Sequence, residues 1–543
     1  MSAHHHDCRT SNSSIRWAIV CLATGLVAAC GSSGAGVTIE RSDRSAAEPG
    51  ASAATTPETA ATDPPMTTEP TQPADPTPPT DPTQPADPAQ PTDPPPDTAD
   101  DAPANGTSGV GDSLFPDLGN PGIDVTHYDI DLAYDPASAK IEATVTLSIA
   151  ATAQLDEFTL DQIGLVVDAV RLDDALVAFE LADPEMIITP SSPIAVGTNF
   201  TVAVTYSADG SQSRSAAGVS SGWFPTPLGS FTLNEPDGAR TWLPSNDHPS
   251  DKASYRFSIA VPDGYTAVAN GSLVSSEPAD EGGSVWVWEQ SEPMTTYVIQ
   301  VLTGPYTIVS SETAAGLPLI SAIFDGDDAL MQPFLDVTPL QIEFFEQYFG
   351  PYPLDRYGIA MTDVYFGGAM EEQGRSLFSR EDFRSGELGY GEELLLSHEL
   401  GHQWFGNAVA PARWRDIWLN ESFASYAEWM WLDHAGYLDL EETAASNLEL
   451  RQDGYVATGD PDVAGLFGYE VYEGGAVVLH ALRRTVGEDV FFEILQTWVA
   501  NNVDTSRTTD DFIATAERVS TMDLTDFFAE WLEATDLPDE FPG

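Results

Sequence analysis

The sequence predicts an α+β multidomain fold, in which an antiparallel, sandwich-like β domain precedes a mostly helical domain. Two observations support this prediction. Between residues 113 and 312, short runs such as "HYDIDLAYD" and "FTVAVTYSA" alternate apolar and polar residues, as half-buried strands do. Between residues 313 and 543, segments such as "LMQPFLDVTPLQIEFFEQYFG" and "WLNESFASYAEWMWLDHAG" place apolar residues three and four apart, which is the spacing of helices.

The first 30 residues are predicted to be a signal peptide. Arg16 precedes the apolar run "WAIVCLATGLVAAC", which ends at Cys30 and is too short to span a bilayer. Residues 27–30 resemble a bacterial lipobox, so we expect cleavage before Cys30 and lipidation of that cysteine. A simple signal peptide cleaved near Ala29 is the alternative. Both readings predict an exported protein, and the lipobox predicts a lipid anchor on the outer face of the cytoplasmic membrane or later release from the cell.

Residues 31–112 are predicted to be a disordered linker. They contain a loose Pro-Thr-Asp repeat without apolar periodicity, so they cannot bury a core. Proline-rich chain favours an extended form that rises about 3.1 Å per residue, so this segment could reach on the order of 200 Å. We therefore expect a stalk between the anchor and the folded domains.

The composition is strongly acidic. The chain has 21 Lys and Arg residues against 85 Asp and Glu residues, which gives a formal net charge of -64. Such a surface repels phosphates, so we exclude nucleic acid as a partner. All three cysteines, Cys8, Cys21 and Cys30, lie in the predicted signal peptide, so we expect no disulfide in the exported domains. We expect the protein to be a monomer.

The segment "SHELGHQWFGN" at residues 397–407 carries the metal-binding pattern H-E-x-x-H. On a helix, positions i and i+4 share a face, so His398 and His402 can both face one Zn²⁺ ion. Glu399 lies beside the first ligand, where it can act as a general base. Glu421 follows on a second predicted helix and can complete a site of two histidines and one glutamate with one open position. The large apolar neighbours of Glu421 predict burial, where an unpaired carboxylate is costly.

Together, "HELGHQWFGN" and "WLNESFA" resemble peptidase family M1, the gluzincin zinc aminopeptidases related to alanyl aminopeptidase. The resemblance extends over most of residues 120–535. It implies a thermolysin-like catalytic domain that holds one zinc ion. Members typically show HELAHQWFGN and WLNEGFA, so Gly401 replaces an alanine and Ser422 replaces a glycine. The chain ends about where the catalytic domain of this family closes, which predicts a short form without the C-terminal helical domain.

Two further segments imply an amine-binding site. "FGGAMEEQG" is similar to the family's GAMEN strand, which implies that Glu371 binds the α-ammonium group of the substrate, and Glu372 stands where the family has asparagine. "NEPDGARTWLPSNDHPSDKASY" is similar to a segment at the junction of the two domains, which implies the same role for Glu235. The family's glutamine two places earlier is Leu233 here. Lys252, at the end of this segment, is either structurally paired or a surface lysine.

A third segment implies a residue that stabilises the transition state. In "GYEVYEGGAVVLHALR", Tyr472 matches the family tyrosine whose hydroxyl donates to the oxyanion. Tyr469 is a nearby competitor, and the "EGGA" that follows Tyr472 favours the latter.

These residues predict a zinc metallo-aminopeptidase that removes N-terminal amino acids from peptides with a free N-terminus. In this prediction the metal activates a water molecule, and Glu399 accepts its proton. A thermolysin-like endopeptidase is one alternative, but it would lack the amine-binding glutamates. A catalytically inactive surface binding module is the other, but it would normally have lost a ligand, the base or the tyrosine.

Overall fold

The structure is a computed structural model that describes residues 109–279, 282–451 and 456–543. The predicted signal peptide, Cys30 and residues 31–108 of the predicted linker lie outside the described residues. Within the described ranges, no helix combines the length and apolar character needed to cross a bilayer. Asp112, at the end of the predicted linker, is buried and accepts a hydrogen bond from the Trp414 backbone N–H at 2.8 Å.

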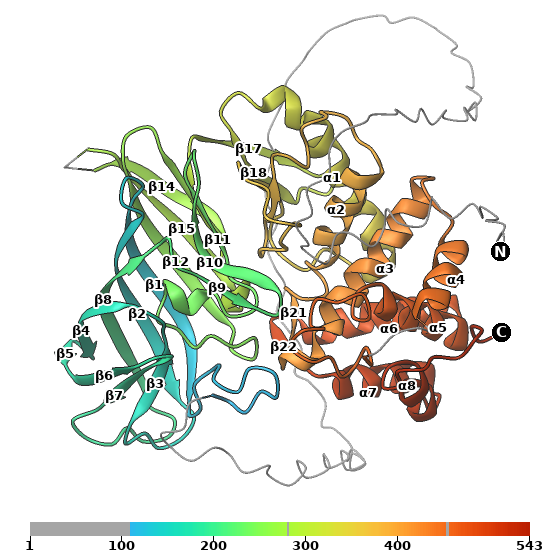
Figure 1. Cartoon of the computed structure of the whole chain (residues 1–543), viewed down its shortest axis with the longest axis horizontal. Helices are drawn as coiled ribbons and strands as arrows, with labels where there is room; N and C mark the ends of the chain where they lie inside the picture. The colour runs from blue at the N-terminus through green and yellow to red at the C-terminus, as the bar shows by residue number, and fades with distance from the viewer. Residues whose placement is uncertain (1–108, 280–281, 452–455) are drawn as a thin grey trace, which may run out of the picture. The chain divides into compact units, whose positions relative to one another are not determined.

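The N-terminal part is built on an eight-stranded sheet (Figure 1). Its strands pair in an antiparallel manner, except that β1 and β12 run parallel. In sheet order they are β14 (Ser272–Pro278), β15 (Ser284–Met294), β12 (Ala253–Val261), β1 (Ile123–Asp135), β2 (Lys140–Ala151), β8 (Asn199–Asp209), β4 (Val166–Leu172) and β5 (Ala175–Leu176).

Two smaller sheets pack on the buried face of the large sheet. One has the order β13 (Thr266–Ala269), β16 (Val301–Gly304), β11 (Ser230–Leu233), β10 (Val219–Pro225), β9 (Ser213–Ala216), and the other β3 (Phe158–Asp161), β7 (Glu185–Thr189), β6 (Ala178–Ala182). The ring of Trp223 lies 5.2 Å from that of Tyr134, and the ring of Phe158 lies 5.5 Å from that of Phe200. Alternate residues of the long strands therefore form a core between layers, as the period-two pattern predicts.

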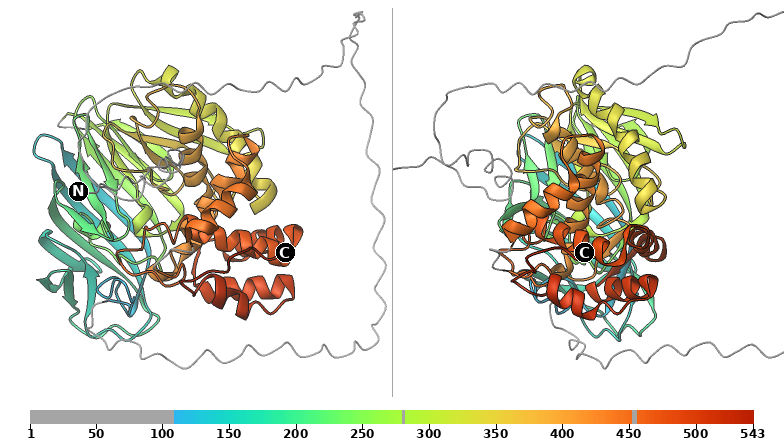
Figure 2. Two further views of the ribbon diagram at one scale, coloured as in Figure 1. Left: turned by 45° about the vertical axis from the view of Figure 1, so that its right-hand side comes forward. Right: turned by 90° about the vertical axis from the view of Figure 1, so that its right-hand side faces the viewer.

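The C-terminal part is mostly helical and has a four-stranded sheet in the order β17-β18-β19-β20. Helices α5–α8, red in Figure 2, lie together in both views. The predicted boundary between residues 312 and 313 falls between β17 and β18, which pair with each other. The elements are β17 (Tyr306–Glu312), β18 (Pro318–Phe324), α1 (Asp328–Phe349), β19 (Ile359–Thr362), β20 (Ser376–Ser379), α2 (Tyr390–Gly401), β21 (Val409–Pro411), α3 (Trp418–His434), α4 (Leu440–Arg451), α5 (Glu473–Val486), α6 (Glu488–Asn502), β22 (Thr505–Arg507), α7 (Thr509–Ser520) and α8 (Thr525–Trp531), with short 3-10 turns at Ala239–Thr241, Thr296–Val298 and Trp414–Asp416.

Three segments differ locally from the prediction. The apolar run 474–502 is two helices, because Gly487 at φ +87° takes a left-handed conformation that ends α5 before α6 begins. The segment 391–409, "GEELLLSHELGHQWFGNAV", has helical spacing throughout, but its helix ends at Gly401, and the chain then turns back through Gly406, whose φ is +126°. The segment 363–375, predicted to contain the GAMEN-like strand, forms no regular strand, and only Met370 bridges Leu377.

Candidate metal centre and active site

Helices α2 and α3 bring the three predicted metal ligands together. The rings of His398 and His402 lie 4.8 Å apart, and their Nε2 atoms lie 3.5 and 3.4 Å from Glu421 Oε2. The two helices approach closely at Gly401, where an added Cβ would lie 3.0 Å from the Ala427 Cβ. This contact packs the middle of α3, the helix that carries Glu421, against the end of α2, which carries His398.

The spacing of these three donors fits a zinc ion. Tetrahedral coordination with bonds of about 2.1 Å places neighbouring ligand atoms about 3.4 Å apart. The two nitrogen–oxygen distances match that separation. Glu421 Oε2 is buried and lacks a hydrogen-bond partner within the described residues, so a bound cation would satisfy this oxygen.

Both histidine rings are oriented through their other nitrogen. His398 Nδ1 lies 3.1 Å from Glu428 Oε2, and His402 Nδ1 lies 3.2 Å from the Phe405 carbonyl oxygen. Since both partners accept hydrogen bonds, they hold a proton on Nδ1, which leaves Nε2, on the side of Glu421, as the atom that would bind a cation. The sequence analysis missed Glu428, although its position two helical turns after Glu421 on α3 could have indicated it.

The ligands and the base strongly influence one another's protonation. Burial opposes charge on Glu421, but His402 and His398 lower the pKa of this carboxyl group to about 2. Burial likewise opposes charge on His398, but Glu421 and Glu428 raise the pKa of its ring well above the usual value. Burial, with further contributions from Glu371 and Glu421, raises the pKa of Glu399 to about 8, although both histidines oppose this shift.

The two predicted amine-binding glutamates lie beside this centre. Ligand atoms of Glu371, Glu399 and His402 lie within 4.8 Å of one another, as do those of Glu235, Glu371 and Glu421. Burial and the neighbouring Glu371 raise the pKa of Glu235 well above its usual value. One buried oxygen on each of Glu235, Glu371 and Glu399 has no partner within the described chain. Such crowding of acids favours the binding of cationic groups.

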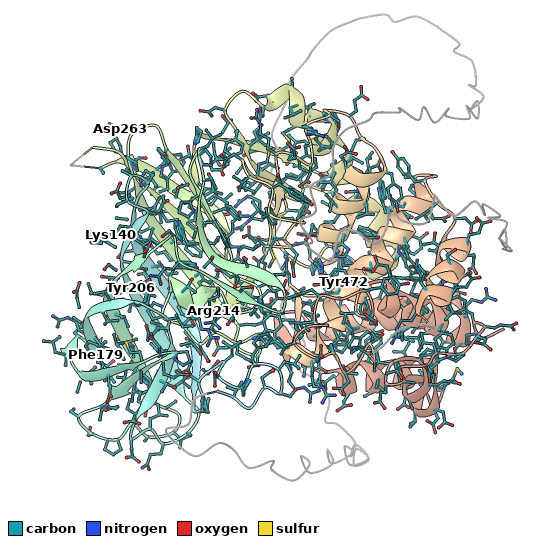
Figure 3. All side chains as sticks on the ribbon, viewed as in Figure 1. Lys140, Phe179, Tyr206, Arg214, Asp263 and Tyr472 are labelled. Atoms are coloured by element: carbon teal, nitrogen blue, oxygen red, sulfur yellow. The ribbon has the colours of Figure 1, made fainter. Side chains whose placement is uncertain are left out.

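The two candidate tyrosines have different surroundings in the structure. The Tyr472 ring stacks on His398 at a centroid distance of 5.8 Å and an interplanar angle of 5°. Tyr472, labelled in Figure 3, directly precedes α5. Burial and the Glu421 carboxylate raise the pKa of Tyr472 well above 10, so its hydroxyl keeps a proton to donate. The Tyr469 hydroxyl instead donates to the Asn447 carbonyl oxygen at 3.0 Å.

The structure also shows the surroundings of Glu372 and Leu233, where the chain departs from the family pattern, and of Lys252. Glu372 is fully buried and accepts a hydrogen bond from Gln300 Nε2, and burial raises the pKa of its carboxyl group well above the usual value. Leu233, at the end of β11, is half-buried against the core. Lys252 is structurally paired, since its Nζ donates to the carbonyl oxygens of residues 407 and 408 at 2.7 and 3.1 Å.

Comparison with known families agrees with this architecture. Residues 125–298 match the peptidase M1 N-terminal domain, and residues 334–531 match the peptidase family M1 domain.

Curated relatives include several aminopeptidases. Endoplasmic reticulum aminopeptidase 1 of Mus musculus is 31% identical over 263 residues, which cover 46% of this chain and 28% of the relative. Aminopeptidase N of Streptomyces lividans is 28% identical over 336 residues, which cover 56% of this chain and 38% of the relative. The matched region thus spans well under half the length of these relatives.

Solved structures match over a larger share of both chains. An M1 zinc metallopeptidase from Deinococcus radiodurans is 28% identical with a TM-score of 0.71, and the match covers 80% of this chain and all of that chain. A two-domain M1 zinc metallopeptidase with bound L-arginine is 27% identical, with the same coverage and a TM-score of 0.71. These matches confirm the predicted fold class and the predicted resemblance. Both domains and the motifs at the centre therefore show that this chain belongs to peptidase family M1.

Proposed function

We propose that the protein is a zinc metallo-aminopeptidase that removes N-terminal amino acids from peptides with a free N-terminus. The observation that carries this proposal is the convergence of two groups of side chains. His398, His402 and Glu421 have the spacing of a zinc site, and Glu235 and Glu371 place unpartnered carboxylate oxygens beside it. The similar solved structures are zinc metallopeptidases, some with bound L-arginine, L-tryptophan or a Tyr-Ser-Ala substrate, which supports the same activity.

His398, His402 and Glu421 would hold the zinc ion. When bound, zinc supplies Lewis-acid polarisation of the scissile carbonyl and a lowered pKa for the attacking water. Glu399 accepts the proton of this water and then delivers it to the leaving amine. A dication near Glu399 favours its carboxylate form, which the base needs.

The remaining residues orient the substrate and stabilise developing charge. Tyr472 donates a hydrogen bond to the oxyanion that forms at the scissile carbonyl. Glu371 and Glu235 accept hydrogen bonds from the α-ammonium group, so the first peptide bond lies over the metal centre. This pair of carboxylates disfavours the endopeptidase alternative, because an endopeptidase must pass uncharged backbone through the same space. The presence of all three ligands, the base and the tyrosine disfavours an inactive binding module.

Hydrolysis of aminoacyl p-nitroanilides tests this proposal. We expect turnover of the free-amine substrate, at least a ~100-fold lower rate after N-acetylation, and loss of activity on chelation that added zinc restores. The Glu399→Gln variant should lose turnover but keep one equivalent of zinc by elemental analysis. Equal rates on free and N-acetylated substrates would exclude an aminopeptidase, and absence of bound metal in both proteins would exclude a zinc enzyme.

We also propose that the protein is exported and held on the outer face of the cytoplasmic membrane by a lipid on Cys30. The lipobox-like residues 27–30 and the linker sequence support this location. Fatty-acid labelling of the native chain, and its loss in a Cys30→Ala variant, would test it. Unlabelled native protein would leave the simple signal peptide as the explanation.

A further inference from the structure

Two buried amide side chains, Gln403 and Asn407, have no part in the mechanism above. They are 0% and 1% exposed and lie in the turn that follows His402. Both donate to the same acceptor, the main-chain carbonyl oxygen of Glu371. The distance is 3.2 Å from Gln403 Nε2 and 2.6 Å from Asn407 Nδ2.

Residues 363–375, which carry Glu371, form no regular strand. The residues beside Glu371 are held by other contacts: the backbones of Met370 and Leu377 exchange two hydrogen bonds at 2.9 and 2.8 Å, and Asn270 Nδ2 donates to the Gln373 carbonyl oxygen at 3.1 Å. The carbonyl oxygen of Glu371 itself is bonded to Gln403 and Asn407. The Oε1 atom of Gln403 accepts from the Gly374 backbone N–H at 3.0 Å, so Gln403 contacts both ends of the turn over 371–374. Gln403 Nε2 also lies 3.2 Å from the Glu399 carbonyl oxygen, which joins this turn to the last turn of α2.

The turn after His402 is itself anchored from the β domain. Lys252 Nζ donates to the carbonyl oxygens of Asn407 and Ala408, and the Tyr297 hydroxyl donates to the Gly406 carbonyl oxygen at 3.1 Å. The segment 403–407 is therefore held on one side by the β domain and on the other side by the metal helix. The Glu371 main chain is bonded to this anchored segment.

This connection matters because an aminopeptidase must hold the α-ammonium group of its substrate at a fixed distance from the metal centre. The α-nitrogen and the first carbonyl carbon of a peptide are separated by only two covalent bonds, about 2.5 Å. A misplacement of about 1 Å between the amine-binding carboxylate and the metal centre can cost roughly 100-fold in rate. The side chain of Gln403, the residue after the predicted ligand His402, is bonded to the Glu371 main chain, and this bond limits such misplacement.

We propose that Asn407 and Gln403 are positioning residues that set the separation between the metal centre and the amine-binding Glu371, and so restrict cleavage to the first peptide bond. This inference rests on the proposed aminopeptidase function. Neither side chain needs to touch the substrate, because each acts through the main chain of Glu371.

The test compares Asn407→Ala and the similarly shaped Gln403→Met with the native zinc-loaded enzyme. We expect full zinc content in both variants, a ~10- to 100-fold higher KM for an alanyl p-nitroanilide, and a smaller change in kcat. The rate on the N-acetylated substrate should be unchanged, so the preference for a free amine should fall. On a longer peptide, mass spectrometry should detect dipeptides among the products.

A binding measurement separates this role from general loosening of the active site. In a Glu399→Gln background, calorimetry should show that Asn407→Ala weakens L-tryptophan binding about tenfold. Asn502→Ala is the matched control, because buried Asn502 donates to the Trp498 carbonyl oxygen at 2.8 Å within α6. This control should leave KM, amine preference and L-tryptophan affinity unchanged.

Two results would overturn the inference. One is a lower kcat in both variants with an unchanged preference for free amines and unchanged L-tryptophan affinity. The other is loss of zinc in both variants, which would place their role at the metal. If the native enzyme itself fails to distinguish free from acetylated substrates, the proposed function fails first, and that outcome is seen before any variant is made.

Discussion

At the scale of single residues, the proposed function assigns to Glu371 the recognition of a charged N-terminus. It is 3% exposed, and its Oε1 atom has no partner in the described part of the chain. A hydrogen bond between a carboxylate and an ammonium group contributes about 1.5–3 kcal/mol, which corresponds to roughly 10- to 100-fold in affinity. An uncharged amide at this position loses most of that contribution.

We therefore expect Glu371→Gln to raise KM for aminoacyl p-nitroanilides about 10- to 100-fold and to reduce the preference over N-acetylated substrates. Zinc content should stay at one equivalent, because the side chain is not among the three ligands. Steady-state kinetics and elemental analysis on the same sample check both statements. Glu449→Gln, an exposed change on α4, is the control. An unaltered KM would show that Glu371 does not bind the ammonium group.

At the scale of secondary-structure elements, the packing of α3 against α5 sets the place of Tyr472. Ser422 Oγ on α3 donates to the Val471 carbonyl oxygen at 2.6 Å, next to Tyr472. On α5, an added Cβ at Gly475 would lie 1.7 Å from Ser422 Oγ and 2.5 Å from its Cβ. The serine that departs from the family pattern at 422 and the glycine at 475 therefore fit each other.

Gly475→Ala should destabilise the protein by about 1–3 kcal/mol and lower kcat, because the clash pushes α5 and Tyr472 away from the metal centre. Adding Ser422→Gly removes both clashing atoms and should restore most of the loss. Ser422→Gly alone should cost about 1–2 kcal/mol through its lost hydrogen bond and the flexibility of glycine.

Thermal unfolding and kcat of the two single variants and the double variant form a cycle that measures this coupling. Gly391→Ala is the control within a helix, since no atom lies within 4 Å of an added Cβ there. Additive effects of Gly475→Ala and Ser422→Gly would contradict the proposed fit.

At the scale of the whole molecule, the β domain contains buried acidic residues, and their protonation couples the stability of the fold to pH. Glu185 on β7 is 5% exposed, lies opposite Asp161 of β3, and has two oxygens without a partner in the described chain. Burial and the Asp161 charge raise the pKa of Glu185 to about 8, although Arg240 opposes the shift. The folded protein therefore keeps a proton that the unfolded chain releases near its ordinary value of 4.5.

Between about pH 4.5 and 8 the folded state binds more protons than the unfolded state, so Glu185 lowers stability as pH rises through this window. Glu185→Gln has no proton to release and should remove this dependence. The variant's free energy of unfolding, relative to that of the native protein, should be higher at pH 8 than at pH 5 by on the order of 1–3 kcal/mol.

Thermal unfolding midpoints of both proteins at pH 5 and pH 8 check this expectation. Glu180→Gln, an exposed change on the neighbouring strand β6, should leave the pH dependence of the native protein intact. A Glu185→Gln variant with the native pH dependence would show that Glu185 is ionised in the folded state.

The sequence alone was enough to predict the layered β domain, the helical domain and three candidate metal ligands, which the structure brings together. Alternation along β1 and helical spacing along α3 depend on neighbours within a few residues, so they are visible without a structure. The ligand types and the four-residue spacing of His398 and His402 are equally local. Glu421 could be predicted because its family-like surroundings are contiguous in the chain.

Only the tertiary structure decided how distant segments meet. It placed Tyr472 rather than Tyr469 at His398, paired Glu428 with that ring, and joined the Glu371 main chain to Gln403 and Asn407. It also ended α2 before His402, where the chain turns back. These contacts depend on the packing of several elements at once, and the one-dimensional pattern of residues records the chemistry of each side chain but not the distances between segments.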